Sequence, residues 1–224
     1  MIFKNFTIYA ERDCGTKYTE KLITSVFDLP VTWGYGNKHF FGRYDTRIKN
    51  SRDTLFICMT RNPYDWVMAL FKHKHHLPFD VGNDINLYLH GEWRSVDYRG
   101  RGWYDNPVAP DSPREIVADR DWENNKRYKN IFKMRSKKMQ YIYDMRNLTP
   151  NHIFFRFEDL VKNPAHCLLR LSHKFNLPVL SVNYPPPHQK KPYPVADNVK
   201  KIIDSNVDWA VEKLFNYFPQ QRRY

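Results

Sequence analysis

Cysteine is scarce in this chain of 224 residues. There are three cysteines, Cys14, Cys58 and Cys167, and each lies far from the other two in the sequence. An odd and scattered set does not make a disulfide framework, and it lacks the close spacing of a metal-binding motif. The pattern predicts a reducing compartment, and it offers no metal site built on cysteine.

Long hydrophobic runs are also missing. The first residues, MIFKNFTIYAERD, contain no long apolar stretch, and no run elsewhere approaches the length of a membrane span. We therefore expect no signal peptide, no membrane anchor and no membrane partner, and we predict a cytoplasmic protein.

Basic and aromatic residues are abundant instead. The formal net charge is +12, and phenylalanine, tryptophan and tyrosine make up 16% of the chain. A partner that carries phosphate, sulfate or carboxylate groups is expected, such as nucleic acid, an anionic nucleotide or a polysaccharide. The apolar content of 42% suits one globular domain over residues 1–224.

Short apolar runs alternate with helical patterns along the chain. Strands are expected at residues 5–10, 53–61 and from residue 152, with a further extended segment at 31–36. These strands are apolar throughout, which is typical of a parallel sheet covered on both faces. Alternating strands and helices predict an α/β fold with helices on both faces of a parallel sheet. The expected helices cover residues 16–29, 62–76, 121–148, 163–177 and 198–218.

An irregular segment interrupts this alternation at about residues 78–121. It is rich in glycine, proline, tryptophan, tyrosine and arginine, and so long an irregular segment is unusual in a compact domain unless it is functional or mobile. Its cations and flat rings suit an anionic sugar chain or a phenolic group, and the alternative is a packed or disordered surface loop. The side chains concerned are Trp93, Arg94, Tyr98, Arg99, Arg101, Trp103 and Tyr104.

The first turn from strand to helix, ERDCGTKYTEK, has features of an anion site. A helix that begins near Thr16 presents free backbone N–H groups and the positive end of its dipole. Gly15 permits a close backbone approach, and Arg12 and Lys17 supply positive charge. The GxxxxGK[ST] pattern of a Walker A loop is absent, because Gly15 is the one glycine here. Taken alone, the stretch favours an ordinary turn.

The second such turn, FICMTRNPYDW, favours the anion site. Arg61 follows a buried strand, and Pro63 is well placed at a helix start. Because ligands bind beyond the carboxyl ends of parallel strands, Arg12 and Arg61 are expected at the same edge of the sheet, where they could hold two phosphates. The alternative for Arg61 is a salt bridge at the strand end, with Asp65 as the partner.

In this order, the motifs resemble those of sulfotransferases that use 3′-phosphoadenosine 5′-phosphosulfate (PAPS), most of all small soluble sulfotransferase-like proteins of bacteria and viruses. Their first loop is similar to ERNSGTNYL, where this chain has ERDCGTKYTEKL, and their second to RNPYDWLLSLY, where it has RNPYDWVMALF. The segments NKHFFG, KMRSKKMQY, FRFEDLVKNP and VDWAVEKL match further motifs. The resemblance runs from Glu11 to about Phe218 and leaves residues 78–121 unmatched.

The resemblance implies a P-loop-NTPase-like fold and a donor site for PAPS, whose product is adenosine 3′,5′-bisphosphate (PAP). Arg61 would bind the 3′-phosphate, and Phe157 stands where a tyrosine near the adenine is common. A phenylalanine such as Phe157 is more often a core residue than an adenine contact, and Glu158 and Asp159 are interpreted as a helix cap or an ion pair. The loop around the 5′-phosphosulfate would consist of Arg12, Cys14, Gly15, Thr16, Lys17 and Tyr18.

The resemblance also implies a reaction without a metal ion. An acceptor oxygen would attack the sulfur in line, so cations and N–H dipoles would stabilise the growing charge. His39 stands where the base is expected, and histidine suits proton removal near neutral pH. Lys38 and Arg12 are the other catalytic candidates. The alternatives are a structural or surface histidine for His39 and a solvated surface lysine for Lys38.

Three positions depart from the family pattern. The loop serine is replaced by Cys14, a tolerable change because the backbone N–H does much of the binding. Asp13 stands where many sulfotransferases have a lysine, so contact with the leaving phosphate would pass to Arg12, Lys17 or Lys38. Ala69 stands where a serine usually supports the 3′-phosphate. A fold that has lost catalysis is therefore one alternative.

The predicted function is sulfuryl transfer from PAPS to a hydroxyl or amine, with a glycan as the preferred acceptor and a small hydroxylated molecule as another. One rival is a P-loop nucleotide kinase or phosphotransferase, which would need ATP and Mg²⁺. Another is a non-catalytic nucleic-acid binder, which we consider less favoured. The cations of the expected basic helix could follow phosphates in that case: Arg127, Lys129, Lys133, Arg135, Lys137 and Lys138.

Overall fold

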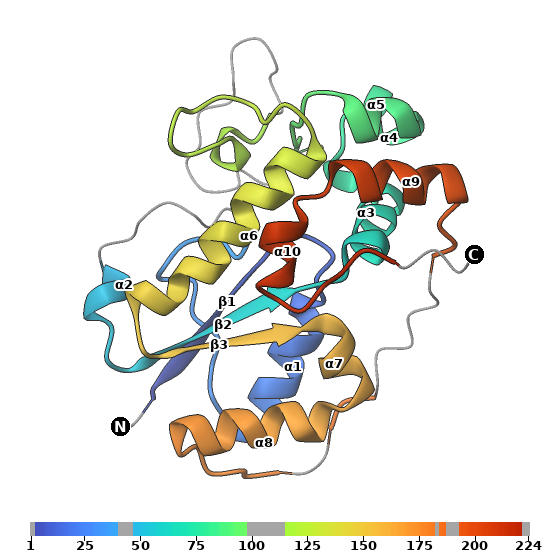
Figure 1. Ribbon diagram of the computed structural model, residues 1–224. Coiled ribbons are helices and arrows are strands. Elements are labelled where there is room, and N and C mark those ends of the chain that lie inside the picture. The colour runs from blue at the N-terminus through green and yellow to red at the C-terminus, as the bar shows by residue number, and fades with distance from the viewer. Residues whose placement is uncertain (1–2, 40–46, 98–114, 182–183, 187–192, 221–224) are drawn as a thin grey trace. The chain divides into compact units, whose positions relative to one another are not determined.

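The computed structural model describes residues 3–39, 47–97, 115–181, 184–186 and 193–220 (Figure 1). The chain divides into two compact units. The first consists of Met1–Asn62 and Gln140–Pro192, and the second of Pro63–Met139 and Tyr193–Tyr224. Each unit is described by itself below, and the expectation of a single domain stays a prediction.

A parallel sheet forms the centre of the first unit (Figure 1). Among the described residues it has three strands, β1 (Asn5–Ala10), β2 (Thr54–Thr60) and β3 (His152–Arg156), in the order β1-β2-β3. All seven residues of β2, TLFICMT, are buried, as expected for a central strand covered on both faces. Ala10 pairs with Met59, so β1 and β2 end side by side. The prediction of an α/β fold with a parallel sheet is confirmed.

Helix α1 (Thr16–Phe27) packs against one face of this sheet. The hydroxyl of Thr19 donates to the sulfur of Met59 over 3.5 Å, and Leu22, Ile23 and Val26 are fully buried. The helical spacing of these apolar residues therefore produced the buried stripe that the sequence predicts.

Helix α8 (Pro164–Phe175) supplies cover beside β3, where the guanidinium of Arg170 lies 6.0 Å from the ring centre of Phe155. The opposite face of β3 meets the end of helix α6 (Ile131–Leu148), where Tyr143 stacks on Phe154 with ring centres 6.2 Å apart. The sheet is thus flanked by helices. The first unit also contains α2 (Arg47–Asn50) and α7 (Phe157–Lys162).

The second unit is helical in its described part. Its longer helices are α3 (Pro63–Lys72), the start of α6 and α9 (Asp197–Asn206). The short elements are η1 (Lys74–His76), α4 (Phe79–Asn83), α5 (Ile85–His90), η2 (Val117–Asp119) and α10 (Trp209–Lys213). Within the described ranges, no helix is long and apolar enough to cross a membrane.

Several predicted helix boundaries are wrong for local reasons. The basic helix begins at Ile131 instead of residue 121, because the side chain of Asn130 accepts the backbone N–H of Lys133 and caps the first turn. The last helix is split in two, because Asp208 caps α10 by accepting the N–H of Val211. The helix expected over residues 62–76 ends at Lys72.

The expectation of an irregular segment at 78–121 is wrong for its first part. Helices α4 and α5 lie there, and the carboxylate of Asp84 accepts the N–H groups of Asn86 and Leu87 at the start of α5. Of the aromatic and basic residues expected to meet an acceptor, Trp93 is buried and Arg94 pairs with Asp80. Tyr98, Arg99, Arg101, Trp103 and Tyr104 lie outside the described residues.

Most cations of the basic helix are paired with carboxylates inside the second unit. Arg135 is buried, donates to both oxygens of Glu212 over 2.5 and 2.8 Å and lies 4.6 Å from the ring centre of Trp66. Lys138, also buried, pairs with Asp119. Lys137 bonds to Glu123 over 2.6 Å, whereas Lys129 and Lys133 are exposed.

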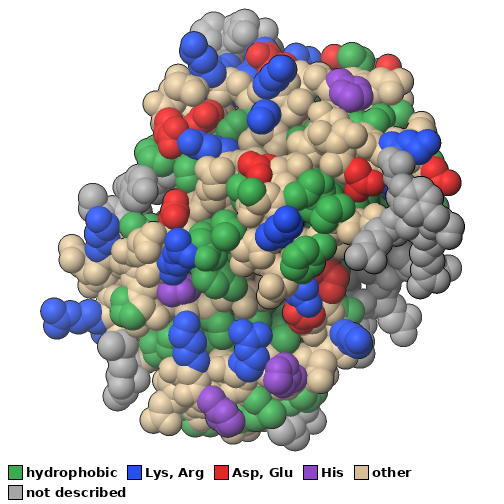
Figure 2. All heavy atoms as spheres, in the orientation of Figure 1, with side chains coloured by type: hydrophobic (Ala, Val, Ile, Leu, Met, Phe, Trp, Pro, Cys, Tyr) green, Lys and Arg blue, Asp and Glu red, His purple; other side chains and the backbone are tan. Residues whose placement is uncertain are grey.

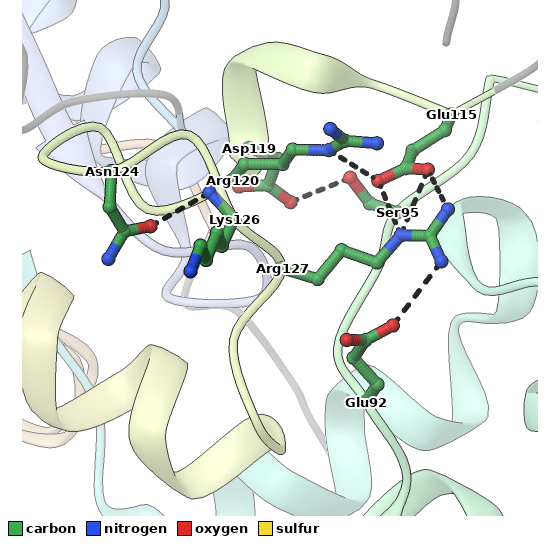
Figure 3. Close-up of polar contacts among 8 residues, drawn as sticks. All are labelled: Glu92, Ser95, Glu115, Asp119, Arg120, Asn124, Lys126 and Arg127. Carbon is green, nitrogen blue, oxygen red and sulfur yellow. Dashed lines mark hydrogen bonds and ion pairs between the residues drawn. The ribbon is translucent and has the colours of Figure 1, made fainter. Parts of the chain in front are cut away.

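A second charged cluster surrounds the buried Glu115 (Figure 3). Arg120 donates to its carboxylate over 2.9 Å, and Arg127 binds both carboxylate oxygens and also reaches Glu92. Burial alone would raise the pKa of Glu115, but the hydrogen bonds from Arg127 and Arg120 outweigh it and lower that pKa to about 2. The charge of Glu115 therefore stabilises the folded state.

We expect Glu212→Gln to destabilise the protein by about 3–5 kcal/mol, because it leaves the charge of Arg135 buried without its partner. The matched control is Asp197→Asn, which removes an exposed ion pair with Lys200 and should cost less than about 1 kcal/mol. Urea denaturation of both variants measures this difference. Equal losses would contradict the assignment of a buried, structural ion pair.

We expect the stability that Glu115 provides to depend on pH. Its pKa is lower in the folded state than its ordinary value of 4.5, so its contribution is complete above pH 4.5 and is lost as pH falls toward about 2. The stability difference between wild type and Glu115→Gln should shrink over that range. A difference that stayed constant from pH 6 to pH 3 would contradict the lowered pKa.

Candidate functional site

The candidate site lies in the first unit, at the carboxyl ends of β1 and β2. The backbone of the loop after β1 turns through two left-handed residues, Asp13 (φ 61°) and Gly15 (φ 80°), and α1 begins at Thr16. No side chain caps this helix, and its first turn contains no acidic residue. The positive end of the helix dipole is therefore not neutralised by its own sequence, as an anion site requires.

Arg61 connects the turn after β2 to this loop. Its Nη1 donates to the carbonyl oxygen of Asp13 over 2.8 Å, and its guanidinium lies 4.9 Å from the ring centre of Phe157. The Arg61 side chain is 3% exposed. The structure thus gives Arg61 a contact with the first loop, where the sequence left open a salt bridge to Asp65.

Phe157 fixes the shape of the loop from the other side. A Cβ atom added at Gly15 would lie 2.3 Å from its ring, so a glycine is needed there for space as well as for its positive φ. The ring is 6% exposed, and its neighbours in the site are Gly15 and Arg61. The structure thus places Phe157 against the first loop, in the packing role that the sequence gave as its alternative, and a place near the adenine stays a prediction.

Glu158 provides a link that sequence reasoning missed. Its Oε1 accepts the backbone N–H of Asn62 over 2.7 Å, so the start of α7 is tied to the turn that carries Arg61. The next residue, Asp159, pairs with Arg156, as the interpretation of an ion pair expected. An acidic residue at a helix start is too common to signal the link of Glu158 by itself.

Arg12 differs from the solvent-facing cation that a phosphate loop suggests. It is 3% exposed, and Glu11 Oε1 accepts both its backbone N–H over 2.7 Å and its Nη1 over 3.2 Å. The carboxylate of Glu11 therefore neutralises part of the Arg12 charge within the loop. The sequence pair Glu11-Arg12 gave no signal of this contact, because adjacent residues seldom pair.

The other predicted loop residues are also brought together at the start of α1. Cys14 and Thr16 are buried, and Lys17 is exposed. Tyr18 is buried as well, and burial raises the pKa of its hydroxyl. The loop thus offers backbone N–H groups, one hydroxyl and an exposed ammonium group.

His39 lies at the end of β1, beside the start of this loop. Its Nδ1 is 2.9 Å from the carbonyl oxygen of Ala10, and its backbone N–H donates to Asn37 Oδ1 over 2.8 Å. Because a carbonyl only accepts, Nδ1 carries the hydrogen, and in the neutral ring Nε2 is then the basic nitrogen. Asn37 is buried and was not expected as part of the site.

Lys38 lies near the first turns of α1. Its Nζ is 5.4 Å from the ring centre of Trp33. Its pKa is lowered because burial disfavours the charged amine, and Lys17 acts in the same direction while Glu20 opposes it. Lys38 therefore lies within reach of the charges of both Glu20 and Lys17 on α1.

No protein-family model matches the chain, and no curated protein matches it significantly. The chemistry of the site must therefore be argued from its own residues.

We expect Gly15→Ala to cost clearly more stability than Gly36→Ala. Both glycines have positive φ values, 80° and 96°, which cost a residue with a side chain about 1–2 kcal/mol. A Cβ atom at Gly36 meets nothing within 4 Å, whereas at Gly15 it meets Phe157. Chemical denaturation gives the loss in unfolding free energy for each variant, and the difference between the two losses measures the clash with Phe157. Equal losses would show that the ring moves aside freely.

Proposed function

We propose that the chain is a sulfotransferase that uses PAPS as donor and that its sheet belongs to a P-loop-like fold. The observation that carries this proposal is the contact of Arg61, at the end of β2, with the anion-type loop after β1. The helix N-terminus in this loop suits one anionic group, and the arginine that follows the adjacent strand suits another. Together they suit a nucleotide that carries two separate anionic groups.

The donor would lie along the carboxyl ends of the strands. Its 5′-phosphosulfate would meet the backbone N–H groups at the start of α1, together with Thr16 and Lys17. Arg61 would bind the 3′-phosphate through N–H groups other than the one that donates to Asp13. The first loop contains no Walker A motif, so ATP with Mg²⁺ is a less suitable ligand.

The reaction would be a direct displacement at sulfur. The acceptor oxygen forms a bond to the sulfur as the bond from sulfur to the 5′-phosphate oxygen breaks, and the electron pair leaves with PAP. The acceptor proton passes to His39 Nε2, which the hydrogen bond to Ala10 leaves basic. Lys38 and Arg12 would stabilise negative charge on the leaving phosphate.

The acceptor is a hydroxyl or an amine, with a glycan preferred because of the net charge of +12. Binding to nucleic acid is a weaker alternative, because Arg135, Lys137 and Lys138 of the basic helix pair with carboxylates of the chain itself. Paired cations release few counterions on meeting a phosphate backbone.

Binding of PAP tests the donor site directly. We expect PAP, and not ATP with Mg²⁺, to raise the melting temperature of the wild type. In isothermal titration calorimetry, Arg61→Lys should weaken PAP binding about tenfold or more, because a lysine cannot both hold Asp13 and bind a phosphate with a planar fork. The exposed Arg52 provides the matched control, Arg52→Lys, which should bind as wild type does.

Three outcomes would contradict the proposal. Stabilisation by ATP with Mg²⁺ alone would indicate a phosphotransferase. No response to either nucleotide would exclude the donor site. Equal weakening in Arg61→Lys and Arg52→Lys would show that the loss is not specific to the position of Arg61.

A further inference from the structure

A cavity in the first unit is lined by residues that lie outside the loop of the candidate site. It has a volume of about 470 Å³ and is open to solvent. It is lined by Ile153 and Phe154 of β3 and by Arg170, His173 and Lys174 of α8, and we call it the α8 pocket. Its size falls within the range of sites for small molecules.

The pocket collects positive charge from two side chains of α8, Arg170 and Lys174. Arg170 and Lys174 are four residues apart on α8, a spacing at which like charges lie on the same face and destabilise the helix. Burial lowers the pKa of the Lys174 amine, and Arg170 lowers it further. Within the described parts of the chain, no carboxylate forms an ion pair with Arg170, His173 or Lys174.

The hydrogen bonds around the pocket leave this charge available to a ligand. Lys174 Nζ donates to the carbonyl oxygen of His152 over 2.6 Å, which uses one of its three N–H groups. The pKa of Asp159 is lowered first by its hydrogen bonds from Arg156, which donates to each of its two oxygens over 2.7 Å, and further by the charge of Arg170. A bound anion would relieve the repulsion between Arg170 and Lys174.

Ile153 and Phe154 of β3 supply the apolar part of the lining. The half-buried ring of Phe154 contacts Tyr143, with ring centres 6.2 Å apart, and His152, with ring centres 5.0 Å apart. The side chain of Ile153 is buried and points to the other face of β3, so Phe154 is the flat side chain of this lining. Figure 2 shows Lys or Arg and His side chains on the surface over β3 and α8, with hydrophobic side chains among them. Such a surface is complementary to a ring that carries an anionic group.

We propose that the α8 pocket binds a small aromatic anion. The flat ring lies against Phe154, and a phosphate, sulfate or carboxylate group lies between Arg170 and Lys174. This site is separate from the loop that contains Gly15 and does not depend on the proposed sulfotransferase function.

Calorimetric titration of the full chain with phenyl phosphate tests the proposal. Arg170→Gln should weaken binding at least about fivefold, because it removes one of the two cations that hold the phosphate. Lys49→Gln, which removes an exposed lysine of α2, should change it less than about twofold. Cyclohexyl phosphate and inorganic phosphate should bind more weakly than phenyl phosphate, because neither presents a flat ring to Phe154.

Amide chemical shifts of isotopically labelled protein locate the bound phenyl phosphate. We expect the largest changes at Ile153, Phe154 and the end of α8, in wild type and equally in Arg61→Lys. Changes confined to the loop around Gly15 would overturn the proposal by placing the ligand there. Equal weakening by Lys49→Gln, or equal affinity for inorganic phosphate, would also overturn it.

PAP binding separates this proposal from the proposed function. Arg170→Gln should bind PAP as the wild type does, and Arg61→Lys should bind phenyl phosphate as the wild type does. Loss of phenyl phosphate binding in Arg61→Lys would show that one site takes both ligands, which contradicts a separate α8 pocket.

Discussion

The guanidinium of Arg61 is the contact on which the candidate site depends. It donates to the loop after β1 through Asp13, and it lies over the ring of Phe157, which in turn fills the space beside Gly15. Segments that follow all three strands therefore meet around one buried cation. A buried charge is stable only when its surroundings match it closely, so the geometry of the loop and the position of Arg61 determine each other.

The sequence predicted the parts of the first unit that follow from local patterns. The apolar run TLFICMT gave β2, the helical spacing of Leu22 and Ile23 gave α1, and the order of strands and helices gave a parallel sheet. It also placed Arg61 at a strand end, because a buried strand does not readily accept arginine. These predictions succeeded because each depends on periodicity and burial along a short segment.

The sequence could not predict contacts that join distant segments. Glu158 accepts from Asn62 across 96 positions, and Arg135 pairs with Glu212 across 77. From the sequence, the cations of the basic helix could all contact phosphates. In the structure, most of them are buried or form ion pairs with carboxylates of the chain. The burial of Arg12 against Glu11 was missed for a different reason, since neighbouring side chains rarely share one environment.

The close packing of Phe157 on Gly15 also limits how this site can change during evolution. A smaller residue at position 157 removes the clash with a side chain at position 15 and leaves the strain of the positive φ, so the order of the two substitutions matters. Losing the ring first would also remove the surface on which Arg61 rests. Positions 15 and 157 should therefore covary among relatives of this protein, and a residue with a side chain at the first should accompany a small residue at the second.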